Sequence, residues 1–183
     1  IMDIYERDFG VDFKSDQSPL TEADRQANAV IMDVLSTHYS HIPVISEENK
    51  EVTYAERSEW DQFWLVDPLD GTKEFIKKNG EFTVNIALIK KGAPVAGIVY
   101  IPVDRIAYSA ESGSGAFKTL IDGESQRINN DKHYLDQDQV KVVASRSHIT
   151  PEVADFVREL KESGKEVELI SVGSSLKLCL VAE

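Results

Sequence analysis

The sequence predicts a layered domain that mixes helices and strands, an α/β or layered α+β fold. Some stretches place apolar residues at helical spacing, whereas others are short apolar runs bounded by turn residues. The middle of the chain carries only the second pattern, which predicts an antiparallel block between helical segments. With 183 residues, 42% of them hydrophobic, the chain suits one well-buried core.

The first part of the chain is expected to hold one long helix and two buried strands. Residues 21–38 have apolar side chains at helical spacing, and Thr21 can cap the N-terminus of that helix. Residues 42–46 and 63–66 are short apolar runs of the kind found in buried strands. The polar stretch 50–60 between them is expected to be a surface loop or a broken helix.

The remainder predicts one or two helical turns after residue 73, then a meander, and finally alternating strands and helices. Turns containing Gly or Pro separate the meander strands, and residues 121–139 are polar and expected to be irregular. The expected meander strands are 82–90, 95–101, 106–110 and 116–119. The expected later elements are a strand at 140–144, a helix at 151–162 with Pro at its first position, a strand at 167–170 and a closing helix from about 174.

The composition argues against several classes of protein. A formal net charge of −12 disfavours a nucleic-acid polymer as partner, because such binding needs Lys and Arg to neutralise many phosphates. No apolar run approaches the roughly 20 residues that span a bilayer, and the acidic start lacks the basic region of an export signal. The single cysteine, Cys179, excludes an internal disulfide and is expected to be a buried thiol. A small anionic substrate stays compatible, because bound divalent cations reverse the field of an acidic pocket.

The tetrad Asp67-Pro68-Leu69-Asp70, directly after a buried strand, indicates a metal site. Proline fixes its own φ and offers no N–H, so we expect a turn that lets both aspartates point into one site. The carbonyl of Leu69 becomes available as a third ligand, and Mg²⁺ prefers such oxygen ligands. The simpler alternative is an ordinary surface turn.

Residues on either side of the tetrad fit the same site. Gly71 lets the backbone approach a ligand, and a helix opened by Thr72 and Lys73 offers free N–H groups to a phosphate. Glu47 ends the preceding buried strand, and ligand sites gather beyond strand ends in open α/β sheets. Taken alone, Glu47 also reads as a solvated surface acid, and Asp24 as a helix-start acid.

Three motifs in this order resemble the inositol monophosphatase superfamily of lithium-sensitive, Mg²⁺-dependent phosphatases, which share one layered α/β sugar-phosphatase fold. They are Lys-Ser-Asp-Gln-Ser-Pro-Leu-Thr-Glu-Ala-Asp at 14–24, Ser-Glu-Glu at 46–48 and Trp-Leu-Val-Asp-Pro-Leu-Asp-Gly-Thr at 64–72. Within that superfamily, four further segments resemble the bacterial 3'(2'),5'-bisphosphate nucleotidases of the CysQ type. These segments are 73–76, 79–85, 145–148 and 173–183.

The resemblance implies a reaction and a set of site residues. The reaction would be removal of the 3'-phosphate of 3'-phosphoadenosine 5'-phosphate, giving AMP, as in sulfur assimilation and nucleotide recycling. Two or three Mg²⁺ ions would be held by Glu47, Asp67, the carbonyl of Leu69 and Asp70, with Asp67 bridging two ions. Asp24 and Thr72 would orient and deprotonate the attacking water, with Glu47 nearby. Substrate-binding residues would be Gly71, Thr72, Lys73, Arg146, Ser174, Ser175 and Lys177.

Several of these roles have simpler alternatives. The second phosphate of the substrate needs a cation, for which the candidates are Lys73, Lys77, Arg146 and Lys177, but each base also reads as a solvated surface charge. Ser174 and Ser175 could equally be ordinary caps of the last helix. The remaining alternatives are the same chemistry on inositol monophosphate or another sugar phosphate, and a non-catalytic phosphate- or metal-binding module. No partner can be named for His148.

Both ends of the chain read as cut points. Residues 1–5 resemble the tail of a helix, and Glu183 ends an apolar helical pattern that has no cap. We therefore expect residues 1–183 to be one segment, comprising the metal-binding part of such a phosphatase and the start of its C-terminal part. The superfamily's Trp-Asp motif, which completes the metal site, is absent from this segment, so the segment alone should be inactive or feeble. The resemblance suggests a cytoplasmic enzyme, with peripheral attachment to the inner face of the membrane left open.

Overall fold

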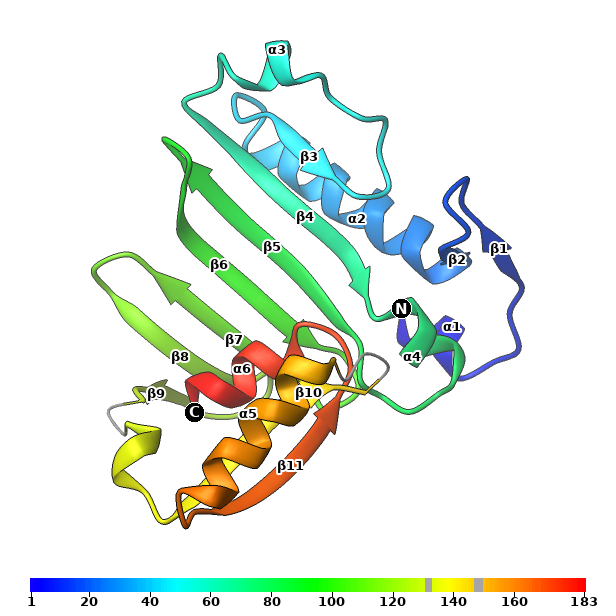
Figure 1. Ribbon diagram of the computed structural model, residues 1–183. Coiled ribbons are helices and arrows are strands. Elements are labelled where there is room, and N and C mark those ends of the chain that lie inside the picture. Colours follow the sequence, from blue (N-terminus) through cyan, green and yellow to red (C-terminus); the bar gives the residue numbers. More distant parts are fainter. Residues whose placement is uncertain (131–132, 147–149) are drawn as a thin grey trace.

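A seven-stranded sheet forms the centre of the computed structural model, which describes residues 1–130, 133–146 and 150–183 (Figure 1). The strand order is β3-β4-β5-β6-β7-β8-β9, and neighbours are antiparallel except for the parallel pair β3 and β4. The strands are β3 (Val44–Ser46), β4 (Gln62–Asp70), β5 (Thr83–Lys90), β6 (Ala93–Ile101), β7 (Ile106–Glu111), β8 (Gly115–Leu120) and β9 (Ser125–Ile128). The predicted antiparallel meander is therefore confirmed.

The long helix α2 (Glu22–His38) packs on one face of this sheet beside β4 (Figure 1). Thr21 caps it through a complete capping box with Asp24, as the sequence led us to expect. At the other end of the helix the ring of Tyr39 meets the ring of Trp64 on β4, with centroids 5.4 Å apart. A short hairpin of β1 (Val11–Phe13) and β2 (Pro19–Thr21) leads into the helix.

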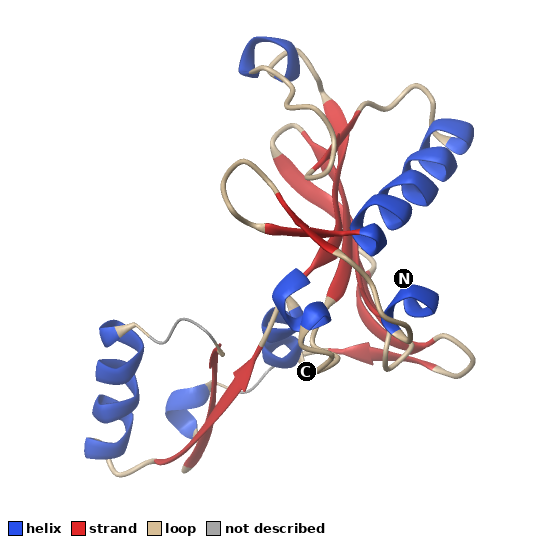
Figure 2. Cartoon of the chain, turned by 90° about the vertical axis from the view of Figure 1, so that its right-hand side faces the viewer, coloured by secondary structure: helices blue, strands red, loops and turns tan. Residues whose placement is uncertain are grey.

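The last third of the chain forms a second, smaller unit. Strand β10 (Gln139–Ser145), helix α5 (Pro151–Glu162) and strand β11 (Glu166–Val172) make a βαβ unit whose two strands are parallel. Figure 2 shows this unit projecting from the lower end of the large sheet. The chain then returns through residues 173–175 to α6 (Leu176–Ala182), whose Cys179 is buried, as predicted, against Ile101 and Tyr108.

An aromatic cluster joins the N-terminus to the segment that follows β4. Tyr5, the last residue of the short helix α1 (Met2–Tyr5), packs on Phe75 of α4 (Thr72–Ile76) and on Phe82, with ring centroids 5.2 and 5.0 Å apart. Phe75 and Phe82 are fully buried and meet each other edge to face. The cluster therefore fixes the position of α4 relative to the start of β5.

Two expectations about secondary structure were wrong in detail. The stretch 121–139 contains β9 and a turn of 3₁₀ helix (Tyr134–Asp136), because β9 pairs with β8 as a polar edge strand that has no alternating apolar signal. Strand β4 continues through Pro68 to Asp70, although we had expected a turn there. The stretch 50–60 holds the one-turn helix α3 (Tyr54–Arg57), consistent with a broken helix.

No helix among the described residues is long and apolar enough to cross a bilayer.

The aromatic cluster yields a stability prediction. Phe75→Ala should lower the free energy of unfolding by about 3–5 kcal/mol, because it opens a cavity between Tyr5 and Phe82 that packing cannot refill. Tyr54→Ala, at a ring that is 75% exposed, is the matched control and should change it by less than about 0.5 kcal/mol. Urea unfolding followed by circular dichroism measures both, and equal losses would contradict the cluster's role.

Candidate metal-binding and active site

A β-bulge shapes the end of β4. Asp67 pairs with Asn85 and Asp70 with Thr83, so three steps along β4 match two steps along β5. The extra residue breaks the regular ladder and re-aims the side chains around it. Pro68 is tolerated there because a bulge leaves one backbone N–H without a ladder partner. The predicted turn at the tetrad is thus a bulge within the strand.

Glu47 lies beside Asp67 because β3 runs parallel to β4. Ser46 is in register with Val66, and the backbone N–H of Glu47 donates to the carbonyl of Val66 at 3.1 Å. The acid that follows β3 therefore reaches the same sheet edge as the acid that follows Val66. Our expectation that these two carboxylates gather at a strand end is borne out by the register.

Burial and neighbouring acids together set the electrostatics at Asp67. Burial, followed by the charges of Glu47 and Asp70, raises the pKa of Asp67 to about 7. One hydrogen bond opposes this shift, because the N–H of Leu69 donates to Asp67 Oδ1 at 3.1 Å. Ionising Asp67 is therefore costly unless a cation is nearby.

A lysine supplies a cation at one side of this cluster. Lys14 Nζ lies 2.8 Å from Glu47 Oε1 and 2.6 Å from Glu48 Oε1. Burial lowers the pKa of Lys14, but the hydrogen bonds to both glutamates outweigh it and raise the pKa above the usual value. The ammonium group therefore stands where positive charge is favoured, which fits a site built for cations.

Asp70 is bound by donors from β5 and from the loop that precedes α6. Its Oδ2 accepts the backbone N–H of Ser175 at 2.5 Å, with Thr83 Oγ1 at 3.5 Å and Asn85 Nδ2 at 3.4 Å. Within the described ranges, no group of three or more His, Cys, Asp or Glu side chains is close enough to hold a metal ion. The structure therefore brings Glu47 and Asp67 together, while Asp70 is held apart by other donors.

The donor set nevertheless fits a hard divalent cation. Glu47, Asp67 and Asp70 offer carboxylate oxygens, and the carbonyl of Leu69, between the two aspartates in the sequence, accepts a long 3.3 Å hydrogen bond from Thr72 Oγ1. The raised pKa of Asp67 and the ion pair between Lys14 and Glu47 both indicate excess negative charge at this point. A bound cation would relieve it.

Asp24 serves two purposes at once. Its Oδ2 completes the capping box by accepting from the N–H of Thr21 at 2.8 Å and from Thr21 Oγ1 at 2.5 Å. Its Oδ1 accepts the hydroxyl of Thr72 at 3.2 Å, so Asp24 and Thr72 form the predicted pair. Asp24 is only 2% exposed, and the capping contacts fix its orientation toward Thr72.

The turn into α4 packs against the loop that precedes α6. Gly71 has φ +93°, and a Cβ placed on it would lie 3.0 Å from the carbonyl oxygen of Glu81 and 3.1 Å from Ser174 Cβ. A glycine is required there both for the backbone conformation and for this close approach. Residues Gly71, Ser174 and Ser175 are therefore neighbours, as a shared substrate site requires.

Three of the predicted cations, Lys73, Lys177 and Arg146, differ in their surroundings. Lys73 is exposed on α4 and forms no ion pair with any residue that the structure describes. Lys177 Nζ donates to the carbonyls of Ser174 and Val172, at 2.5 and 3.4 Å. Arg146 pairs with Glu81 through two of its nitrogens. Ser147 and His148, which contributed to the resemblance, lie outside the described residues.

Sequence reasoning missed three polar residues of this site, Glu81, Thr83 and Asn85. Thr83 and Asn85 alternate at the start of β5, Glu81 lies two residues before it, and each of the three hydrogen-bonds the loop at 173–175. Their spacing of two is the signal that could have found them, because alternate strand residues share one face.

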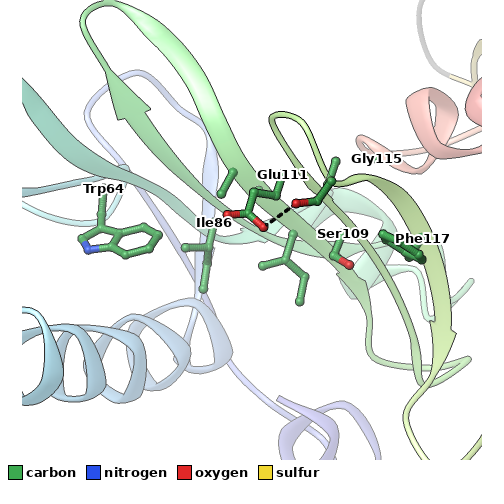
Figure 3. Close-up of a pocket in the computed structure, with 11 residues that line it drawn as sticks. Trp64, Ile86, Ser109, Glu111, Gly115 and Phe117 are labelled. Atoms are coloured by element: carbon green, nitrogen blue, oxygen red, sulfur yellow. Dashed lines mark hydrogen bonds between the residues drawn. The ribbon is translucent and has the colours of Figure 1, made fainter. Parts of the chain in front are cut away.

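Two cavities lie against the large sheet. One of about 1140 Å³ is lined by Glu47, Asp67 and Asn85 and bounded by Cys179 and other residues of α6, so it opens onto the carboxylates. The other, of about 370 Å³, is the pocket of Figure 3; it shares part of its lining with the first and also includes Trp64 and Phe117. Its lining is mainly apolar and contains none of the predicted site residues. The larger cavity is the candidate substrate site.

Comparison with known proteins places the chain in a family. The model of the inositol monophosphatase family matches residues 1–183. The chain belongs to this family. The predicted family and the predicted layered α/β fold are both confirmed.

Members of the inositol monophosphatase family include close relatives of this chain. The 3'(2'),5'-bisphosphate nucleotidase CysQ of Escherichia coli (strain K12) is 46% identical over 185 residues, covering 100% of this chain and 71% of the relative. The crystal structure of CysQ from Bacteroides thetaiotaomicron matches with a TM-score of 0.81 and 46% identity, covering 100% of this chain and 70% of that one. The extragenic suppressor protein suhB of Bartonella henselae matches with a TM-score of 0.76 and 29% identity, covering 99% and 67%.

The raised pKa of Asp67 yields a pH prediction for the metal-free protein. The folded state holds a proton on Asp67 up to about pH 7, whereas the unfolded chain releases it near 3.8, so stability falls as pH rises between these values. Asp67→Asn should therefore stabilise the metal-free protein at pH 8 by about 1–3 kcal/mol, allowing for partial exposure, and by less at pH 5.

Thermal unfolding in EDTA at both pH values measures this difference. Asp61→Asn, at an exposed loop position just before β4, is the matched control and should show no pH-dependent gain. An Asp67→Asn variant that is no more stable than wild type at pH 8 would show that the acids are not in repulsive contact.

Proposed function

We propose that the protein is a Mg²⁺-dependent 3'(2'),5'-bisphosphate nucleotidase that hydrolyses the 3'-phosphate of 3'-phosphoadenosine 5'-phosphate to AMP and phosphate. The observation that carries this proposal is the 46% identity with nucleotidases of that name across the whole chain. The acid cluster at the end of β4 supports it independently, because phosphoryl transfer depends mainly on positioning and charge stabilisation.

Glu47, Asp67, Asp70 and the carbonyl of Leu69 are the proposed ligands of two or three Mg²⁺ ions. When bound, these ions would neutralise phosphate charge and make a water molecule acidic enough to attack at neutral pH. The proposal requires Asp70 to share its carboxylate between the cations and the N–H of Ser175. It also requires Lys14 to leave Glu47 or share it.

Asp24 and Thr72 are proposed to orient and deprotonate the attacking water. The Thr72 hydroxyl has one proton, which it can donate to Asp24 Oδ1 or to the Leu69 carbonyl, and its oxygen lone pairs can accept a hydrogen bond from water. Asp24 is held by Thr21 and cannot turn away, which keeps Thr72 in a fixed orientation. Glu47, 53% exposed in its side chain, is a second acceptor near the same point.

The substrate's phosphates are proposed to lie over the turn into α4. Backbone N–H groups of Gly71 and Thr72 suit the transferred phosphate, and Ser174 and Ser175 lie beside that turn. Lys73 is the proposed base for the second phosphate, because it belongs to the same turn, is exposed and takes part in no ion pair with the described residues. Lys177 remains a weaker candidate, since its ammonium already contacts two carbonyls.

The division of the chain into two parts and its location in the cell are also proposed. Residues 1–183 are proposed to comprise the metal-binding part, built on the large sheet, and the start of the part that follows it, built on β10 and β11. A cytoplasmic location is proposed on the resemblance to the CysQ nucleotidases.

Substrate competition tests the proposed function. Full-length protein with Mg²⁺ should release phosphate from 3'-phosphoadenosine 5'-phosphate with a kcat/KM at least tenfold above that for inositol 1-phosphate. Asp67→Asn should lower turnover of both by more than about a hundredfold, because it removes a charged ligand. Preference for inositol 1-phosphate would keep the metal site but assign the protein to another substrate class.

The proposed contact between Lys73 and the second phosphate of the substrate can be tested separately. Lys73→Ala should raise KM for 3'-phosphoadenosine 5'-phosphate by about tenfold, since one charge-assisted contact is lost, and leave KM for 3'-AMP nearly unchanged. Lys90→Ala, on the far end of β5, is the matched control. An equal rise in both KM values would show that Lys73 does not bind the second phosphate.

A further inference from the structure

Glu81 collects three hydrogen bonds from two distant parts of the chain. Its Oε2 accepts the backbone N–H of Gly173 at 2.8 Å and Nε of Arg146 at 3.0 Å, and its Oε1 accepts a second nitrogen of the same guanidinium. The side chain is only 19% exposed. Arg146 also donates to the carbonyl of Ser171 at 2.9 Å, so both of its contacts are to protein.

The loop that Glu81 holds is under conformational constraint. Ser174 has φ +48°, which lies in the left-handed region that residues with side chains rarely adopt. Gly173 admits no side chain, because a Cβ there would lie 2.5 Å from Glu74 Cγ. Such a loop needs outside contacts to stay in place, and the hydrogen bond from Gly173 to Glu81 is one of them.

Glu81 contacts both halves of the substrate site. Its side chain holds Gly173, and its backbone oxygen lies against Gly71 at the turn into α4. Further along the same strand face, Thr83 Oγ1 lies 2.8 Å from Ser175 Oγ, which in turn donates to Asn85 Oδ1 at 2.9 Å. Glu81, just before β5, and Thr83 and Asn85 at its start therefore form a polar row that contacts the loop.

We propose that Glu81 is a positioning residue that holds the Gly173–Ser175 loop against the turn at Gly71 and Thr72, and that Arg146 acts through Glu81 rather than on the substrate. This inference rests on the proposed function, because it concerns the same phosphate-binding site. It replaces the sequence-based expectation that Arg146 binds a phosphate directly.

The role of Arg146 follows from charge. A carboxylate beside an anion-binding loop repels an anionic substrate unless a cation neutralises it. Arg146 supplies that cation in forked geometry, which a guanidinium matches to a carboxylate. Removing Arg146 alone should therefore weaken substrate binding more than removing the charges of both Arg146 and Glu81.

A mutant cycle with two substrates tests the inference. Arg146→Ala should raise KM by about tenfold for 3'-phosphoadenosine 5'-phosphate and equally for 3'-AMP, which lacks the second phosphate, with kcat changing less. Adding Glu81→Gln should recover most of that loss, because glutamine still accepts the N–H of Gly173 and carries no charge. Arg105→Ala, which breaks the exposed pair with Asp122, is the matched control and should change neither KM.

Two outcomes would overturn the inference. If Arg146 binds the second phosphate directly, its loss would raise KM only for the bisphosphate, and Glu81→Gln would give no recovery. Arg146→Lys, which keeps the charge but not the fork, guards against a failure of the alanine variant to fold, and an effect confined to the bisphosphate would again contradict the proposal. If wild type prefers inositol 1-phosphate, the proposed function fails, but the recovery is then measured with that substrate and still decides the role of Glu81.

Discussion

Repulsion among carboxylates at the end of β4 is the constraint on which this site depends. Burial of Asp67, together with the charges of Glu47 and Asp70 beside it, raises the pKa of Asp67 to about 7. A protein core accepts such a cluster only when positive charge compensates it. Lys14 compensates one side of the cluster, and the N–H of Ser175 compensates Asp70 on the other. A bound divalent cation would compensate the negative charge that remains.

The rest of the fold brings these groups to one place. The parallel pairing of β3 with β4 delivers Glu47, and the bulge at Pro68 re-aims the two aspartates that flank it. The capping box of α2 fixes Asp24 against Thr72 as a consequence of starting the helix. The aromatic cluster around Phe75 then anchors α4, and the polar row on β5 anchors the loop that faces it. Elements that stabilise the fold therefore also set the geometry of the site.

Much of this could be predicted from the sequence, because the evidence was local. Helix 22–38 carries its own cap and apolar period, and the meander strands are separated by turn residues. The site was predictable where acids follow strands directly, as at Glu47. The partner of Arg146 was not, because Glu81 is 65 residues away and only tertiary packing joins them. The strand through Pro68 was missed because a bulge depends on register with the neighbouring strand, which sequence pattern does not encode.

The most direct test of the account is a crystal structure of the full-length protein with Mn²⁺ in place of Mg²⁺, read by its anomalous scattering. Mn²⁺ accepts the same oxygen ligands, and its anomalous scattering distinguishes it from water and from lighter ions. The account predicts a peak between Glu47 and Asp67, within coordination distance of the Leu69 carbonyl, with the ammonium of Lys14 displaced from Glu47. No peak at the end of β4, with Lys14 still paired to Glu47, would contradict it.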